Sequence, residues 1–181
     1  METKNNFNII LIGMPGAGKT FIGNKLAKLL VQFEYIDTDQ KIEEETGLTI
    51  SEIFEKYGEK YFRKLETNLL QNLSKNKNQI ISIGGGAIEN EENLKLINNC
   101  GLTFYMQTTI DEIFNRIKDE THRPLIHNKN PKQTLRNLLK KREQNYLKAK
   151  FIIDTTQKPA YTILDEIIGK YENYAKQMSL C

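Results

Sequence analysis

Short apolar runs alternate with amphipathic stretches along most of this chain. Five apolar runs have the length of buried strands, and they cover residues 7–12, 33–36, 79–83, 102–106 and 151–153. Between them, apolar residues recur every three or four positions, which is the spacing of helices that bury one face. Strands that are apolar on both faces and alternate with such helices form parallel sheets covered by helices. We therefore predict a single α/β domain, residues 1–181, with three layers.

Individual residues mark where several helices should begin and end. Thr49 and Glu52 have the spacing of a capping box, and Gly58 is expected to interrupt the helical pattern that follows. Pro131 is suited to the first turn of another helix. The C-terminal residues, 175–181, are predicted to fray.

The first apolar run leads directly into a glycine-rich loop, residues 13–20, with the sequence Gly-Met-Pro-Gly-Ala-Gly-Lys-Thr. The loop fits G-x-x-x-x-G-K-[ST], and a helical pattern follows it, which is the context that a P-loop requires. Glycines let successive N–H groups turn toward phosphate oxygens, and the helix N-terminus adds partial positive charge. The alternative, a glycine-rich turn with a surface lysine, does not explain this context. We predict a nucleoside triphosphate site formed by Gly16, Ala17, Gly18, Lys19, Thr20 and Phe21.

Two carboxylates follow the second apolar run, at the sheet edge where open α/β folds bind their ligands. Asp37 and Asp39 point the same way if the chain stays extended. One of them can hold, through water, the Mg²⁺ that the Thr20 hydroxyl is expected to bind, and the other can accept a hydrogen bond from a hydroxyl nucleophile. The sequence Asp-Thr-Asp is also common in turns and helix caps. The neighbouring P-loop favours the functional interpretation.

Three consecutive glycines, Gly84, Gly85 and Gly86, follow the third apolar run. They lose backbone entropy on folding, so a structural requirement must favour them. That requirement is either a tight strand-to-helix crossing or a close approach of the backbone to a ligand. The position at the carboxyl end of a strand favours the ligand.

A polar segment with two prolines and little helical periodicity covers about residues 118–131. A loop of this length in a nucleotide enzyme is expected to be a mobile lid. Arg123 within it could be a solvated loop residue, but phosphoryl transfer uses a mobile cation that arrives on closure. Arg63 could equally form a weak surface ion pair, and Arg142 could belong to a solvated helix face.

The composition excludes several other kinds of site and location. Two cysteines and two histidines are too few for a disulfide framework or a zinc site. No apolar run approaches the roughly 18 residues of a membrane span, and the first residues lack a signal-peptide pattern. We therefore expect a cytoplasmic protein that does not bind membranes. The net charge of +3 comes from basic residues spread among acidic ones, which fits an enzyme of anionic substrates better than a nucleic-acid partner. Nothing in the sequence demands a dimer, so a monomer is expected.

Together these residues resemble the shikimate kinase family, which has a nucleoside-monophosphate-kinase-like P-loop fold. The resemblance covers roughly residues 8–169 and rests on G-M-P-G-A-G-K-T, D-T-D, F-R-K-L-E, G-G-G, R-P-L, R-E-Q-N-Y and the I-D-T run before Pro159, in that order. It implies ATP-dependent phosphorylation of the shikimate 3-hydroxyl, with ATP and shikimate as substrates and Mg²⁺ as cofactor. It also implies a five-stranded parallel sheet in the order 2-3-1-4-5, with acceptor-binding helices over about residues 38–75.

On the phosphate side, the resemblance implies that Lys19 and Arg123 bind phosphate oxygens. Thr20 would be the Mg²⁺ ligand, and Asp37 would support the metal through water. The adenine would be clamped by Arg116 and by the loop from Asp154 to Pro159. That loop lacks an arginine that some relatives carry.

On the acceptor side, Arg63 and Arg142 would grip the substrate carboxylate, which suits the bidentate geometry of guanidinium groups. Asp39 would hydrogen-bond the ring hydroxyls, including the one that is phosphorylated. The other residues implied in acceptor binding are Glu66, which would orient the arginines, the platform Gly84, Gly85 and Gly86, and the apolar wall of Phe54 and Phe62. The expected catalytic residues are Lys19, Asp39 and Arg123.

Two other functions fit parts of this pattern. A gluconate kinase or a nucleoside monophosphate kinase of the same fold would use the same P-loop with another acceptor, and a screen of acceptors separates these enzymes. A non-catalytic nucleotide switch would require neither an acceptor site nor a lid arginine. Slow ADP release with every acceptor would favour the switch.

Overall fold

The computed structural model describes residues 7–118 and 130–180. This part of the chain contains five strands, with helices between them and one helix after the last strand. The strands are β1 (Asn8–Ile12), β2 (Glu34–Asp37), β3 (Gln79–Ser82), β4 (Gly101–Gln107) and β5 (Phe151–Asp154). The helices are α1 (Lys19–Leu29), α2 (Thr38–Thr46), α3 (Ile50–Leu73), α4 (Glu91–Cys100), α5 (Ile110–Ile117), α6 (Pro131–Tyr146) and α7 (Ala160–Ser179), with a short 3₁₀ helix η1 (Ala87–Glu89).

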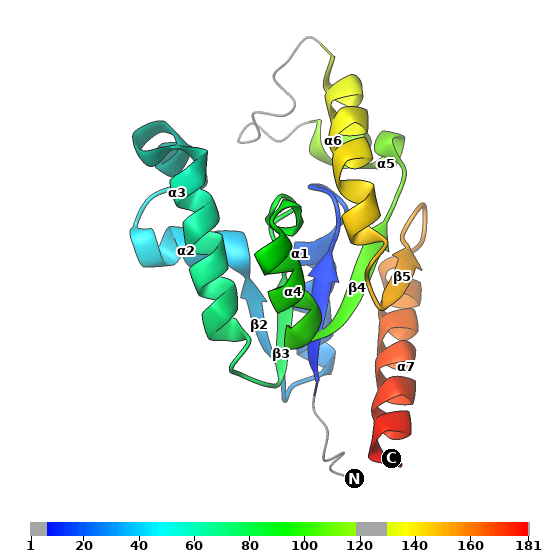
Figure 1. The fold of residues 1–181 in the computed structure, drawn as a ribbon. Helices are drawn as coiled ribbons and strands as arrows, with labels where there is room; N and C mark the ends of the chain where they lie inside the picture. The colour runs from blue at the N-terminus through cyan, green and yellow to red at the C-terminus, as the bar shows by residue number, and fades with distance from the viewer. Residues whose placement is uncertain (1–6, 119–129, 181) are drawn as a thin grey trace.

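The strands form one parallel sheet in the order β2-β3-β1-β4-β5, which confirms the predicted order. The central strand β1 pairs with β3, where Ile10 lies opposite Ile81, and with β4, where Ile10 lies opposite Thr103. Because all the pairings are parallel, the carboxyl ends of the strands meet at one edge of the sheet (Figure 1). The P-loop follows β1 and the glycine turn follows β3, so both lie at that edge.

Successive residues of the three central strands, β3, β1 and β4, face two different apolar clusters, one on either side of the sheet. Ile10 of β1 and Ile81 of β3 belong to a cluster that includes side chains of α2, α3, α4, α5 and α6. Their neighbours Ile9 and Ile80 belong to a second cluster with side chains of α1 and α7. The sheet is therefore buried on both faces, which confirms the predicted three-layer α/β/α fold.

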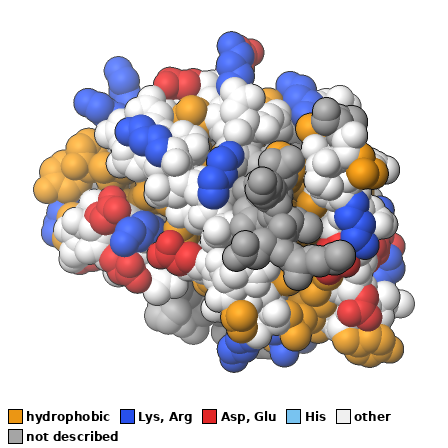
Figure 2. Space-filling view, turned by 90° about the horizontal axis from the view of Figure 1, so that it is seen from below, with side chains coloured by type: hydrophobic (Ala, Val, Ile, Leu, Met, Phe, Trp, Pro, Cys, Tyr) orange, Lys and Arg blue, Asp and Glu red, His pale blue; other side chains and the backbone are white. Residues whose placement is uncertain are grey.

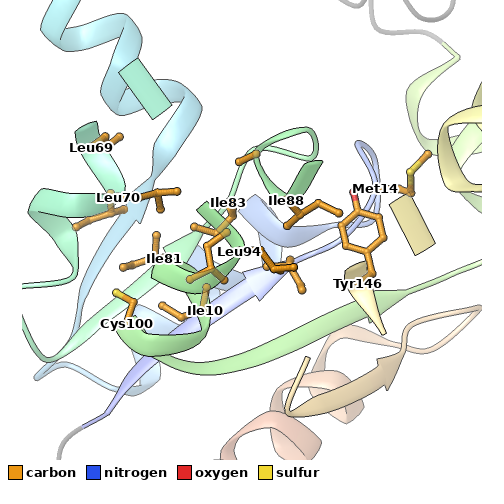
Figure 3. Packing of buried hydrophobic residues seen from close by; sticks show 14 of the residues in the cluster. Ile10, Met14, Leu69, Leu70, Ile81, Ile83, Ile88, Leu94, Cys100 and Tyr146 are labelled. Carbon is orange, nitrogen blue, oxygen red and sulfur yellow. The ribbon is translucent and has the colours of Figure 1, made fainter. Parts of the chain in front are cut away.

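The first cluster reaches the carboxyl edge of the sheet through Tyr146, at the end of α6. Figure 3 shows Tyr146 at one end of the cluster, with Leu94 of α4 and strand residue Ile10 further along it. The Tyr146 ring stacks on Tyr105 of β4 with centroids 5.0 Å apart, and its hydroxyl donates to the carbonyl oxygen of Gly85 at 2.8 Å. The core thus fixes the end of α6 against the glycine turn.

Several predicted helix boundaries are confirmed. Thr49 and Glu52 form the capping box of α3, and Gly58 adopts φ 79° and ψ 169°, which kinks this helix. Pro131 begins α6. The predicted lid falls largely outside the described residues, between Lys118, which caps α5, and Asn130, which caps α6.

The structure differs from the sequence-based reasoning at two places. The chain does not stay extended beyond Asp37, because α2 begins at Thr38 and Asp37 Oδ1 accepts hydrogen bonds from the N–H groups of Asp39 and Gln40. The helix-cap interpretation of Asp37 is therefore correct. At the C-terminus, α7 continues to Ser179 instead of fraying from residue 175, because Ala175 is still buried.

The described helices include none that is long and apolar enough to cross a membrane. On the face seen in Figure 2, lysine and arginine side chains are interspersed with aspartate and glutamate side chains. The charges on this face are therefore mixed, as they are along the sequence.

Candidate active site

The P-loop crosses the carboxyl edge of the sheet between β1 and α1. Gly16 and Gly18 have φ values of 81° and 93°, in the left-handed region that other residues rarely adopt. Space is also limiting at Gly16, where a Cβ would come 2.6 Å from a side-chain carbon of α5. Lys19 Nζ folds over the loop and donates to the carbonyl oxygens of Gly13 at 3.0 Å and Met14 at 3.2 Å. The loop thus presents an ammonium group together with the N-terminus of α1, which suits an anion.

Three oxygen-bearing side chains form a hydrogen-bonded group beside the P-loop. The Thr20 hydroxyl donates to Asp37 Oδ2 at 2.8 Å, and the Tyr35 hydroxyl lies 3.3 Å from the same oxygen. Burial raises the pKa of Tyr35 to about 12, and the charge of Asp37 adds to this effect, so the phenol stays protonated and can donate. Tyr35 was not predicted as a site residue, although its i, i+2 spacing from Asp37 on one strand was a signal.

The pair of Thr20 and Asp37 fits a magnesium ion. The described residues contain no group of three or more histidine, cysteine, aspartate or glutamate side chains that could hold a metal. Mg²⁺ does not require such a group, because it usually binds through one or two protein oxygens, water and substrate phosphates. A hydroxyl and a carboxylate in contact beside the P-loop supply that donor set.

A cavity of about 210 Å³ opens on the other side of the P-loop. It is lined by Ala17, Gly18, Phe21, Ile22, Arg116, Thr155, Lys158, Ala160 and Ile163. Arg116 bridges two of its walls, because its Nη1 donates to the carbonyl oxygen of Ala17 and its Nη2 to that of Thr155, both at 3.3 Å. Apolar side chains and a guanidinium plane form surroundings suited to a flat aromatic base.

The structure brings most of the predicted adenine residues to this cavity. Arg116, Phe21 and the loop before α7 all contribute to its walls, while Pro159 caps α7 between two lining residues. Sequence reasoning missed Ile163, one turn into α7. The missed signal was Pro159, which marks the start of α7 and so places Ile163, in the first turn of this helix, close to the loop that lines the cavity.

The acceptor-side residues converge on the glycine turn after β3. A Cβ on Gly84 would overlap Asp39 Oδ1, and a Cβ on Gly86 would lie 2.7 Å from Arg63 Nη2. The glycines therefore let side chains of α2 and α3 approach the backbone of the turn closely, and a larger residue would displace these side chains. The Gly84 N–H donates to the Thr38 hydroxyl oxygen at 2.9 Å, which ties the turn to the start of α2. Asp39 thus reaches the site from a helix, not from an extended strand.

Arg63 is held by two glutamates of its own helix. Its Nη1 donates to Glu66 Oε2 at 2.7 Å, and its Nε and Nη2 donate to Glu59 Oε1 at 3.2 and 2.8 Å. Glu66 is only 2% exposed, and burial raises its pKa to about 7 against the opposing effect of Arg63. The charges of Asp39 and Arg142 also act on Glu66, so these four predicted residues form one electrostatic group.

Arg142 of α6 is a buried residue, 8% exposed, and not part of a solvated helix face. Its Nε and Nη2 both lie 2.7 Å from Glu89 Oε1. Glu89 also pairs with Lys141. Burial raises the pKa of Glu89, but its hydrogen bonds with Lys141 and Arg142 outweigh that effect and hold it below the usual value. Sequence reasoning missed Glu89, because its partners lie more than fifty positions away in the chain.

The two phenylalanines predicted to form an apolar wall lie next to each other. Phe54 and Phe62 of α3 pack with ring centroids 5.0 Å apart, and Phe62 is 4% exposed. The Arg63 guanidinium lies 5.5 Å from the centre of the Phe62 ring. Arg123 lies outside the described residues, so its role as a lid cation stays a prediction.

A phosphate loop with a base-sized cavity on one side and a charged cluster on the other defines a P-loop phosphotransferase. Residues 15–172 match the family model described as shikimate kinase, and this chain belongs to that family. A shikimate kinase from Thermodesulfovibrio yellowstonii is 41% identical over 165 residues, which cover 91% of this chain and 95% of that protein. One from Bordetella avium is 39% identical over 178 residues, which cover 98% of this chain and 85% of that protein.

Solved structures agree with this assignment. The shikimate kinase from Acinetobacter baumannii in complex with shikimate superposes with a TM-score of 0.89 at 38% identity, covering 94% of this chain and 96% of that one. A gluconokinase from Sinorhizobium meliloti superposes with a TM-score of 0.64 at 13% identity. The second likeness concerns the fold alone, so the rival acceptor gluconate gains no support from it.

Proposed function

We infer that this protein is a shikimate kinase, which transfers the γ-phosphoryl group of ATP to the 3-hydroxyl of shikimate. The products are shikimate 3-phosphate and ADP, and the reaction is a step of the shikimate pathway toward chorismate and the aromatic amino acids. Beside the family membership, the observation that carries this function is the convergence of Asp39, Arg63 and Arg142 around the glycine turn. The Asp39 carboxylate can accept hydrogen bonds from substrate hydroxyls, and the guanidinium groups of Arg63 and Arg142 can bind a substrate carboxylate.

On the phosphate side, Lys19 would exchange its two carbonyl partners for phosphate oxygens when ATP binds. Arg123 is proposed to add a second cation from the lid. The phosphoryl transfer transition state is loose, so positioning and charge neutralisation supply most of the rate enhancement. Thr20 and Asp37 would hold Mg²⁺, which neutralises charge on the β- and γ-phosphates when it is bound.

On the acceptor side, Arg63 and Arg142 would bind the shikimate carboxylate, with Phe54 and Phe62 against the ring. Glu66 would orient Arg63, to which it is already hydrogen-bonded. Asp39 would align the reacting hydroxyl and accept its proton late in the transfer. Its place against Gly84 supports this role, because the carboxylate is fixed at the sheet edge beside the P-loop.

The nucleotide would lie in the cavity beside Arg116, with Phe21 and the residues before and after Pro159 around the base. We further propose a monomer, because nothing in the sequence demands a dimer. A cytoplasmic location follows from the dependence on ATP. Neither a nucleic acid nor a membrane is required by this chemistry.

The decisive experiment is a coupled ADP-release assay with MgATP, with and without shikimate. Gluconate and nucleoside monophosphates serve as control acceptors. We expect ADP release that depends on shikimate and is abolished by Lys19→Ala. Turnover with another acceptor and none with shikimate would overturn the substrate and retain the P-loop, while slow ADP release with every acceptor would favour a nucleotide switch.

Two variants separate the proposed roles on the acceptor side. Asp39→Asn should reduce kcat by at least about 100-fold, which is the contribution of a positioned proton acceptor. Near-normal turnover would refute that role. Arg142→Ala should chiefly raise the KM for shikimate, and a change confined to the KM for ATP would show that Arg142 belongs to the nucleotide site.

A further inference from the structure

Glu89 is the last residue of η1, the short helix that follows the glycine turn, and the proposed function gives it no role of its own. Its Oε1 accepts a hydrogen bond from Nε of Arg142 and forms an ion pair with Nη2 of the same guanidinium, each at 2.7 Å. Its Oε2 pairs with Lys141. The side chains of Glu89 and Arg142 are 21% and 10% exposed, so this ion pair is largely shielded from water.

The same arrangement holds the other arginine of the acceptor cluster. Glu59 Oε1 accepts hydrogen bonds from Nε and Nη2 of Arg63, at 3.2 and 2.8 Å. In both pairs, one carboxylate oxygen sits at the same edge of the guanidinium group. A guanidinium carries five N–H donors, and this edge uses two of them. Each glutamate can therefore fix its arginine and leave other donors for a second carboxylate.

Two further contacts attach α6 to the glycine turn without Glu89. The Asn145 side-chain amide donates to the carbonyl oxygen of Ile88 at 3.0 Å, and the Tyr146 hydroxyl donates to that of Gly85 at 2.8 Å. The position of the helix is thus maintained by its last turn. The carboxylate of Glu89 is therefore not needed to place the helix, and its contacts orient the Arg142 guanidinium relative to the turn.

We propose that Glu89 is a positioning residue, which aims Arg142 at the substrate carboxylate and thereby sets the affinity for shikimate. This inference rests on the proposed function. A long, flexible side chain that must be ordered during binding loses rotamer freedom, and ordering it beforehand removes that cost from the binding step. Glu89 acts only through Arg142, so it should affect neither ATP binding nor the chemical step.

The test compares steady-state kinetics of purified variants, with wild type measured first. Glu89→Ala should raise the KM for shikimate about tenfold, because Arg142 loses its fixed direction, and leave kcat and the KM for ATP unchanged. Glu89→Gln keeps an oxygen that can accept from Arg142, so its KM should stay within about twofold of wild type. Glu91→Ala removes an exposed glutamate two residues further on and should change nothing.

A double-mutant cycle makes the test specific to the pair. In an Arg142→Ala background, Glu89→Ala should produce no further change in the KM for shikimate. Three results would overturn the inference: an unchanged or lower KM in Glu89→Ala, a change in kcat or in the KM for ATP, or full additivity with Arg142→Ala. Should Glu89→Ala melt well below wild type, Glu89→Asp supplies the same comparison, because it withdraws the carboxylate by one methylene and must also raise the KM. If the proposed function itself is wrong, the wild-type protein will release no ADP in response to shikimate, and this result is distinct from the three above.

Discussion

Glu66 makes the stability of this protein depend on pH, because it is a carboxyl group buried within the acceptor cluster. Burial raises its pKa from 4.5 to about 7 against the opposing effect of Arg63. Between these two values the folded protein retains a proton that the unfolded chain has released. The contribution of this site to stability is therefore fully present below about pH 4.5 and is lost as the pH rises through 7. A difference of about 2.5 in pKa, at 1.36 kcal/mol for each unit, amounts to about 3 kcal/mol.

Glu66→Gln tests this reasoning, because the neutral amide resembles the protonated acid at every pH. The free energy of unfolding of the variant minus that of wild type should rise by about 3 kcal/mol between pH 4.5 and pH 8. Urea unfolding at four pH values and constant ionic strength measures this difference. Glu59→Gln is the matched control, since Glu59 pairs with the same arginine but is 64% exposed; its effect should vary by less than about 0.5 kcal/mol. A difference for Glu66→Gln that does not vary with pH would refute the argument.

Three further predictions concern separate parts of the site. Gly86→Ala places a methyl group 2.7 Å from Arg63 Nη2, so the KM for shikimate should rise about tenfold; Gly169→Ala, where a Cβ meets nothing within 4 Å, is the control, and equal effects would contradict the prediction. Arg116→Ala should raise the KM for ATP about tenfold by removing a wall of the cavity, and a matching rise for shikimate would argue against that placement. Tyr35→Phe removes a hydroxyl from Asp37, so half-maximal activity should require about two to three times more Mg²⁺; an unchanged Mg²⁺ titration would exclude this role.

The phosphate half of the site could be predicted from the sequence because its determinants are local. The strand, the loop and the helix that make the P-loop are consecutive, and the left-handed Gly16 and Gly18 follow from the motif itself. The sheet order came from the resemblance, and the hydrophobic pattern established only that strands and helices alternate. Asp37 shows the limit of local reasoning. An i, i+2 argument assumes an extended chain, whereas the Asp37 carboxylate itself begins α2 by capping it.

The acceptor half could not be derived in the same way, because its contacts join distant segments. The resemblance implied roles for Arg63 and Arg142. The alternative that Arg142 belongs to a solvated helix face was excluded only by the structure, in which this residue is 8% exposed. The partner of Arg142, Glu89, is separated from it by 53 positions. No periodicity links two residues so far apart, and many glutamates of the chain would have been equally plausible partners.

The two halves of the site meet where the glycine turn touches the P-loop. A Cβ on Gly85 would lie 2.9 Å from Pro15 Cδ, so this glycine lets the turn after β3 pack directly on the loop after β1. The carbonyl oxygen of the same residue accepts the hydroxyl of Tyr146, which anchors α6. Gly85 thus contacts both the phosphate loop and the helix that carries Arg142. Both loops follow adjacent, fully buried strands, so the sheet holds the phosphate loop and the glycine turn side by side. Under the proposed function, that placement determines the distance from phosphate to acceptor, and the glutamates behind each arginine determine how the acceptor is held.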